Sequence, residues 1–98
     1  MKITKNKATD LLTLSVEGSI NTQTSPEFEQ AVTSALKECP HLAIDLAKVD
    51  YVSSSGLRVF LEAENAVEGS GSLVIKNVPP AVQEVFDMTG FSALLHLE

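Results

Sequence analysis

Short runs of strand composition alternate with stretches of helical periodicity along most of this 98-residue chain. The strand-like runs lie at residues 2–6, 11–16, 41–46, 72–76 and 94–97, and the helical stretches lie at 25–38, 54–68 and 81–89. Strands that alternate with helices pair in parallel through right-handed crossovers, whereas the first two runs are joined by a polar turn and predict a hairpin. The sequence therefore predicts a single α/β domain over residues 1–98. It should hold a mixed, mostly parallel sheet with helices packed against it, in the order β-β-α-β-α-β-α-β.

The predicted helices have recognisable boundary signals. The first opens on residues 25–27 (SPE), which supply Ser25 as N-cap, a proline at the first helical position and an acid in the first turn. It ends at Cys39, because the proline that follows disfavours helical geometry in the residue before it. The second helix stops at residues 69–71 (GSG) and the third at Gly90, since glycine is the usual residue beyond a helix C-terminus.

Composition and charge exclude several classes of partner. The net charge of −6, without any cluster of Lys and Arg, argues against binding to nucleic acid or to an anionic membrane surface. Cys39 is the only cysteine, so no internal disulfide can form. The first ten residues contain no apolar segment of a secretory signal, and no apolar run approaches the roughly twenty residues that span a bilayer. We therefore expect a cytoplasmic protein without direct membrane binding.

Three consecutive serines, Ser53, Ser54 and Ser55, stand where the second helix is predicted to begin, and Gly56 follows them. We call residues 53–55 the serine stretch. Serine is favoured at helix starts because its hydroxyl accepts a hydrogen bond from a backbone N–H that lacks a helical partner. The same N–H groups and the positive end of the helix dipole also favour a phosphate. The stretch is therefore either a simple helix cap or the site of a phosphorylated serine.

A second polar segment, residues 18–24 (GSINTQT), is predicted to lie close to the serine stretch. Both segments follow a strand and precede a helix, so both are expected beyond the carboxyl ends of parallel strands, where functional loops gather. Asn21 is either a turn residue or a polar neighbour of Ser54. Arg58, four residues before Glu62, is either one half of a solvated ion pair or a recognition residue beside the serines.

Other chemistries have little support. Cys39, His41 and His96 are the only soft metal ligands, and a structural zinc site needs four clustered ones. Residues 69–71 precede a strand, whereas a nucleotide-binding loop follows a strand and opens a helix, so ATP would have to come from another protein. A serine hydrolase would need a base beside Ser54, and SSSGL is not the G-x-S-x-G elbow. We expect no metal, no cofactor and no enzymatic activity.

The chain resembles the STAS domain, and within it the small stand-alone anti-sigma factor antagonists of bacteria. The resemblance covers nearly the whole chain and is most specific at LAIDLAKVDYVSSSGLRVFL, followed by PPAVQEVFDMTGF. The family signature, Asp-Ser-Ser/Thr-Gly-Leu, puts Ser53 at the Asp position and Ser54 at the phosphorylated position, with Ser55 and Ser53 as alternatives. Asn21 stands where the family often has an acidic residue. Relative to the family, this chain thus lacks negative charge at two positions near Ser54.

The resemblance implies a partner switch. The unmodified protein, a monomer when free, would bind an anti-sigma factor serine kinase through Asn21, Thr22, the serine stretch, Gly56 and Arg58. The kinase would use its own Mg·ATP to phosphorylate Ser54, the added charge would break the interface, and a PP2C-type phosphatase would reset it. STAS domains also serve as non-switching subunits that dock on membrane transport ATPases, and this is the alternative function.

Overall fold

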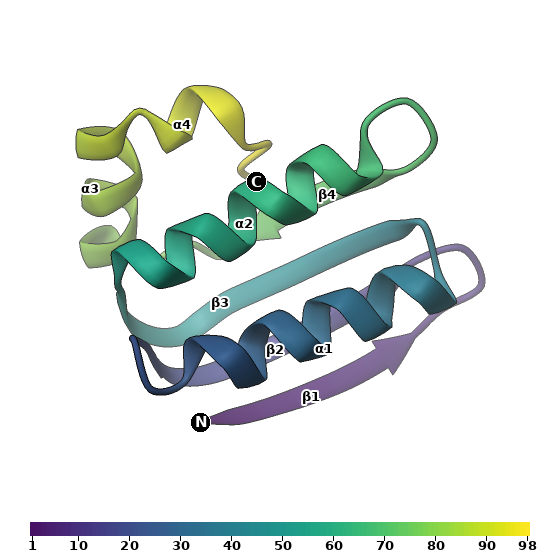
Figure 1. Ribbon diagram of the computed structural model, residues 1–98, viewed down its shortest axis with the longest axis horizontal. Coiled ribbons are helices and arrows are strands. Elements are labelled where there is room, and N and C mark those ends of the chain that lie inside the picture. The colour runs from purple at the N-terminus through teal and green to yellow at the C-terminus, as the bar shows by residue number, and fades with distance from the viewer.

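The computed structural model describes residues 1–98 and contains one four-stranded sheet with the strand order β1-β2-β3-β4 (Figure 1). The strands are β1 (Lys2–Lys7), β2 (Leu12–Ile20), β3 (His41–Val52) and β4 (Ser72–Lys76). β1 pairs antiparallel with β2, whereas β2 with β3 and β3 with β4 pair in parallel. The predicted hairpin and the mixed, mostly parallel sheet are confirmed.

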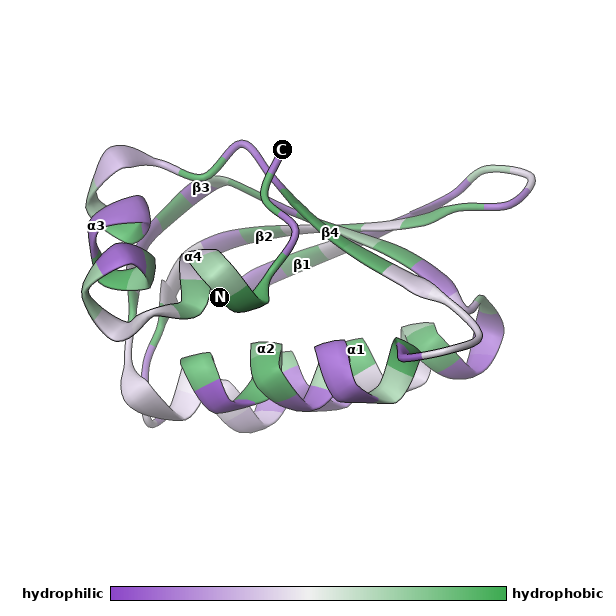
Figure 2. Ribbon diagram, turned by 90° about the horizontal axis from the view of Figure 1, so that it is seen from above, coloured by the Kyte–Doolittle hydropathy of each residue, from purple (hydrophilic) through white to green (hydrophobic).

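Two long helices cover one face of this sheet, and two shorter helices pack beyond them. The helices are α1 (Ser25–Glu38), α2 (Ser54–Val67), α3 (Pro80–Thr89) and α4 (Phe91–Leu94). α1 and α2 lie side by side over the same face, and no helix covers the opposite face (Figure 2). Both helices begin at the same end of the sheet, because each follows the carboxyl end of a parallel strand (Figure 1). None of the helices has the combination of length and apolar character that crossing a bilayer requires.

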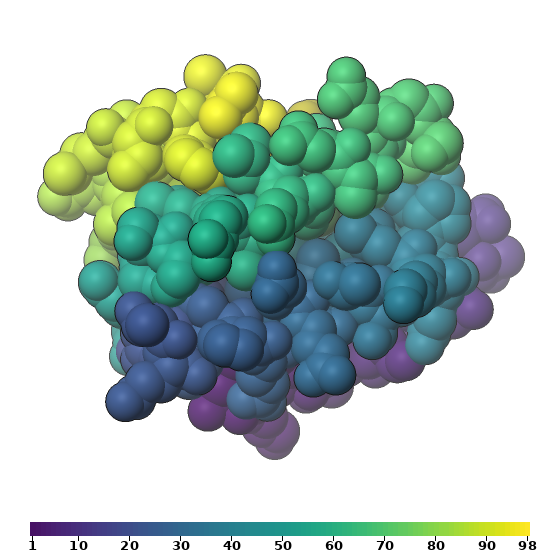
Figure 3. Space-filling view, in the orientation of Figure 1, coloured from purple at the N-terminus to yellow at the C-terminus, as the bar shows by residue number.

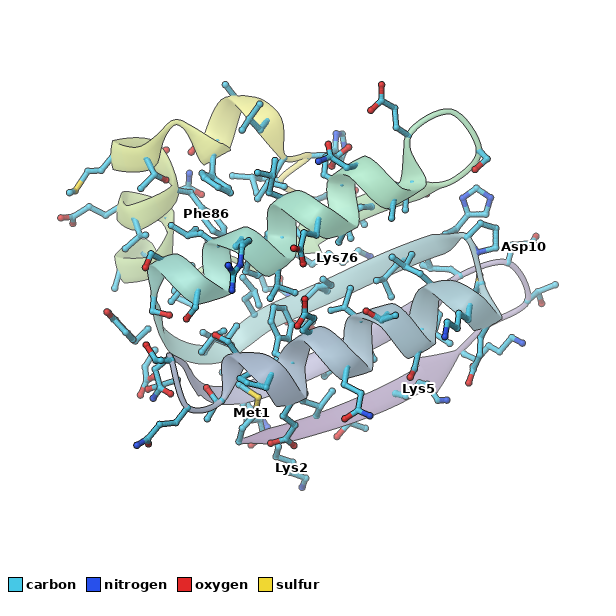
Figure 4. The ribbon with its side chains drawn as sticks, in the orientation of Figure 1. Met1, Lys2, Lys5, Asp10, Lys76 and Phe86 are labelled. Carbon is cyan, nitrogen blue, oxygen red and sulfur yellow. The ribbon has the colours of Figure 1, made fainter.

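The core lies between the sheet and the helices. A cluster of 23 buried apolar residues fills this layer. Phe28 of α1, Phe60 of α2 and Phe86 of α3 stack through it, with ring centroids 5.2 Å and 5.6 Å apart along the series. Figure 4 shows Phe86 reaching from α3 toward α2. Tilted and edge-to-face ring pairs add about 0.5–1.5 kcal/mol each beyond their burial, so this series fixes three helices relative to one another.

β2 and β3 extend farther than the sequence analysis predicted. β2 continues to Ile20, so the loop expected at residues 18–24 begins only at Asn21. β3 continues through residues 47–52, beyond the strand predicted at residues 41–46. The register of the two strands shifts twice, first between Ser15 and Glu17 of β2 and then just after Gly18. Such irregularities interrupt the alternation of buried and exposed residues, so a period-two pattern does not reveal the strand there.

The predicted last strand at residues 94–97 is wrong in its extent. Leu94 ends α4, and only Leu97 forms a bridge, which is parallel to Ile75 of β4. The amide of Glu98 donates to the carbonyl oxygen of Ile75 at 2.8 Å. This segment therefore lies along the edge of β4 without becoming a full strand.

Most predicted helix boundaries are confirmed, and one is corrected. Gly69 and Gly90 have left-handed backbones, with φ of +87° and +82°, and stand where α2 and α3 were expected to stop. Ser25 is not the N-cap of α1. Thr24 occupies that position, and Ser25 is already helical and buried, with only 5% of its surface exposed.

A carboxylate fastens α3 to α4 across the turn at Gly90. Asp87 accepts a hydrogen bond from the side-chain amide of Gln83 at 2.9 Å and another from the hydroxyl of Ser92. The Ser92 hydroxyl is the larger cause, and the Gln83 amide the smaller, of a pKa of Asp87 below its ordinary value. Because both donors favour the charged carboxylate, folding is coupled to deprotonation of Asp87.

We predict that Ser92→Ala lowers the free energy of unfolding at neutral pH and that the loss disappears in acid. A carboxyl whose pKa is depressed by folding contributes stability above its unfolded pKa of about 3.9, and this contribution is lost as the pH falls through the lower folded value. Urea unfolding of both proteins from pH 7 to about pH 2 measures the difference. Ser34→Ala, at an exposed helical serine without a side-chain hydrogen bond, is the control. A deficit that stayed constant with pH would contradict this role of Asp87.

Candidate functional site

The serine stretch caps α2 at the end of β3. Ser53 is the N-cap residue, and its hydroxyl oxygen accepts a hydrogen bond from the amide of Gly56 at 3.3 Å. The amide of Ser53 donates to the carbonyl of Ile20, the last residue of β2, at 2.8 Å. The cap is therefore tied to the neighbouring strand, and the helix start is fixed against two strand ends at once.

A chain of hydroxyl groups joins the serine stretch to the loop before α1. The hydroxyl of Ser55 lies 2.8 Å from that of Ser53 and 3.0 Å from that of Ser25. Ser25 in turn donates to the backbone carbonyl of Asn21 at 2.6 Å. We call this chain the hydroxyl network. It confirms that the two loops meet at one end of the sheet, as their positions after parallel strands predicted.

Ser54 lies outside the hydroxyl network. It is the first residue of α2, it is exposed, and its hydroxyl makes no hydrogen bond to the rest of the protein. Its neighbours Ser53 and Ser55 are only partly exposed, and both hydroxyls are engaged. The three serines thus divide into two that hold the loops together and one that faces solvent.

The predicted loop residues take different roles. The side-chain oxygen of Asn21 accepts hydrogen bonds from the amides of Gln23 and Thr24 at 2.9 Å and 3.0 Å, which closes a turn of the Asx type. The turn interpretation of Asn21 is therefore confirmed, and only its backbone carbonyl reaches the hydroxyl network. Thr22 is exposed at the tip of this turn.

Arg58 is exposed one turn after Ser54 and forms no ion pair with Glu62, contrary to one of the two expectations. Its side chain instead borders a hollow between the two loops, whose lining consists of Thr22, Ser25, Pro26, Glu29, Ser55, Arg58 and Val59. A guanidinium group at this position is available to an anionic or carbonyl group of a partner.

Sequence reasoning missed two contributors to the site. Ser25 was assigned to helix capping, although it is the buried link between the loops. Asp50 was not singled out, yet its carboxylate accepts a hydrogen bond from Ser19 at 2.6 Å and fixes the ends of β2 and β3 beside the site. Nothing in the sequence pattern indicates either of these roles, because each depends on a contact with a residue about thirty positions away.

No group of three or more His, Cys, Asp or Glu side chains is placed to hold a metal ion. His41 begins β3, whose opposite end carries the serine stretch, and its ring hydrogen-bonds Ser72 at 2.9 Å. The backbone of His96 pairs with Ile75 of β4. Neither imidazole lies beside Ser54, so the geometry provides no histidine base for a serine nucleophile.

The family model of the STAS domain matches residues 2–98. The chain belongs to the STAS-domain family. Among its sequence relatives, BtrV of Bordetella bronchiseptica, named as a candidate anti-sigma factor antagonist, is 32% identical over 96% of this chain and 83% of its own length. The anti-sigma-B factor antagonist of Listeria monocytogenes is 30% identical over 96% of this STAS domain and 84% of its own length.

Solved structures share the same fold. An anti-sigma factor antagonist from Mycobacterium paratuberculosis superposes on this STAS domain with a TM-score of 0.90 at 24% identity, over 98% of this chain and 83% of the other. SpoIIAA of Bacillus in its phosphorylated form superposes with a TM-score of 0.74 at 14% identity, over 99% of this chain and 91% of the other. At these identities the likeness establishes the fold alone.

Gly56 lets α2 approach the strand ends of this STAS domain closely. A Cβ atom at Gly56 would lie 2.6 Å from the Cγ2 atom of Ile20 and 3.1 Å from the Cγ1 atom of Val52. Both side chains are almost completely buried, so neither can turn away without disturbing the core. Glycine at this position therefore sets how deeply the capped end of α2 is seated.

We predict that Gly56→Ala lowers the free energy of unfolding by about 1–2 kcal/mol. Overpacking of a filled core costs about 1–3 kcal/mol, and the approach of 2.6 Å to a buried side chain places Gly56→Ala in the upper part of this range. The gain of about 1 kcal/mol that alanine offers over glycine inside a helix then leaves a net loss of about 1–2 kcal/mol. Urea unfolding measures the change, and Ser54→Ala, two residues earlier at an exposed site, is the control. Unchanged or increased stability in Gly56→Ala would show that the close approach does not constrain the helix start.

Proposed function

We propose that this protein is an anti-sigma factor antagonist that binds a kinase-type anti-sigma factor and is released from it by phosphorylation of Ser54. The observation that carries the proposal is the division of the serine stretch. Ser54 presents a free, exposed hydroxyl at the start of α2, while Ser53 and Ser55 are held by hydrogen bonds. A kinase can therefore reach Ser54 without dismantling the hydroxyl network.

The phosphoryl transfer itself belongs to the partner. The γ-phosphoryl group of the partner's Mg·ATP moves to the hydroxyl oxygen of Ser54, ADP leaves, and a base of the kinase takes the hydroxyl proton. This chain contributes a rigidly seated acceptor, because the helix cap and the bond from Ser53 to Ile20 fix the backbone on both sides of Ser54. A PP2C-type phosphatase then removes the phosphate and restores binding.

The added charge acts on the interface more than on the fold. A phosphate carries about −1.5 to −2 charges at neutral pH and is tolerated at a helix N-terminus, where the dipole and the free amides favour an anion. The protein already has a net charge of −6, so a partner that binds it gains from positive charge at its own surface. A phosphate inside that interface must be desolvated and displaces contacts made by the bare hydroxyl.

The proposed interface surrounds Ser54 and consists of the exposed Thr22 and Arg58, the partly exposed Asn21, Ser53 and Ser55, and the backbone at the buried Gly56. Arg58 and Thr22 line the same hollow beside Ser55, so a partner that covers Ser54 also meets them. The sequence relatives reported above are named as anti-sigma factor antagonists and align along nearly the whole chain. They favour the switch over the role of a docking subunit on a transport ATPase.

We predict that the protein isolated from its native cells contains a fraction that is one phosphate heavier and that fragment mapping places the phosphate on Ser54. The fraction should change with growth condition. Ser54→Ala should abolish the modification, whereas Ser53→Ala and Ser55→Ala, whose folding is checked by circular dichroism, should retain it. A phosphate on Ser53 or Ser55 would overturn the assignment, and a protein that is never modified would overturn the switch.

Binding to the kinase-type anti-sigma factor tests the consequence of phosphorylation. We expect Ser54→Ala to bind as tightly as the unmodified protein and Ser54→Asp to bind at least about tenfold more weakly, since a carboxylate that loses its water in the interface without gaining a counter-charge costs more than about 1.4 kcal/mol. Isothermal titration calorimetry measures both affinities. Equal affinity of the two variants would contradict electrostatic release.

A further inference from the structure

A groove runs between α1 and α2 on the helical face of the molecule, along the border between the blue and the teal-green atoms in Figure 3. It encloses about 320 Å³ and has an apolar floor made by Val32, Leu36, Val59, Ala63 and Ala66. Glu29 of α1 and Glu62 of α2 stand on its two walls. We call this feature the α1–α2 groove.

The two glutamates line the same groove from different helices, and neither is paired with a cation. Neither Glu29 nor Glu62 forms an ion pair, because the salt bridges of the protein are Lys5 with Glu38 and Lys76 with Glu98. A hydrogen bond that the protonated Glu62 can donate to the carboxylate of Glu29 is the largest cause of a pKa of Glu62 above its ordinary value, followed by burial and by the negative charge of Glu29. The negative charge of Glu29 therefore disfavours the charged form of Glu62, and a positively charged group between the two would relieve this repulsion.

The protein's own basic side chains do not fill this position. Arg58 lies one turn before Glu62 and lowers its pKa only weakly, as the last of the four causes. Lys37 lines the same groove but follows Glu29 by eight residues, a rise of about 12 Å along α1. The end of the groove beside Glu29 and Glu62 is thus open to a cation of another molecule. At the other end, the positive charge of Lys37 would repel a second cation.

We propose that the α1–α2 groove is a docking site for an arginine side chain projected by a partner protein. The aliphatic stem of an arginine fits over the apolar floor while its head stays polar, which is how long basic side chains bind at such surfaces. A planar guanidinium offers two parallel donors and can bridge Glu29 and Glu62 from both sides, whereas the ammonium of lysine is a single charged point.

The groove continues toward the serine stretch. Glu29 and Val59 line both the α1–α2 groove and the hollow that contains Ser55 and Arg58. A partner seated on the hollow therefore has the groove directly beside it. The proposed arginine site does not depend on phosphorylation of Ser54, so arginine binding can be tested on the unmodified protein.

The test uses nuclear magnetic resonance titration of the isotope-labelled full chain with Nα-acetyl-arginine amide, which mimics an arginine within a polypeptide. We expect saturable shifts of amide signals in residues 29–36 and 59–66, and none with Nα-acetyl-citrulline amide, which has the same shape without the charge. The double variant E29Q/E62Q should weaken binding at least about tenfold. E27Q/E68Q removes the same charge from α1 and from the residue after α2 but lies outside the groove, and should change affinity less than about twofold.

Three outcomes would overturn the proposal. Absence of saturable binding would show that the groove takes no arginine, and an equal loss in E27Q/E68Q would show that only the overall negative charge attracts the probe. Tighter binding of free L-arginine than of the blocked amide would assign the groove to a small molecule, because a side chain within a protein carries no α-carboxylate. Since Ser54 is unchanged in every sample, none of these results bears on the switch.

Discussion

The seating of α2 against the ends of β2 and β3 is the constraint on which the rest of this STAS domain depends. Gly56 leaves no room for a Cβ atom between α2 and the buried side chains of Ile20 and Val52. Ser53 supplies both the cap of the helix and a backbone bond to β2. Because one residue joins strand and helix, a small displacement of α2 would disturb the core, the cap and the position of Ser54 together.

The hydroxyl network shows how a rigid site and a reactive group can share three neighbouring serines. A buried hydroxyl is stable only with a hydrogen-bond partner, and Ser25 meets this need with Asn21 and Ser55. The same bonds fasten the loop before α1 to the start of α2. Ser54 needs no internal partner because it is solvated, and its freedom is what the proposed phosphorylation uses.

Two surfaces of different character adjoin each other on this acidic protein. At the start of α2, the helix dipole and Arg58 favour anions, while farther along the same helix Glu62 and its neighbour Glu29 favour cations. A partner that presents an anionic or carbonyl group to Arg58 and, farther along α2, an arginine to Glu29 and Glu62 would match this order of charges. Charges arranged in such a series orient a partner as well as attract it, which is the usual contribution of electrostatics to recognition.

The sequence by itself determined the order of the elements from β1 to α3, the parallel crossovers, the capped start of α2 and the glycine stops, because these follow from local periodicity and backbone preference. Tertiary structure decided the rest. Irregular pairing of β2 with β3 hid residues 47–52 from any period-two pattern, and the edge of β4 left residues 94–97 with a single bridge. The links from Ser25 to Ser55 and from Glu29 to Glu62 join side chains about thirty residues apart, so only the packing of α1 beside α2 could bring them together.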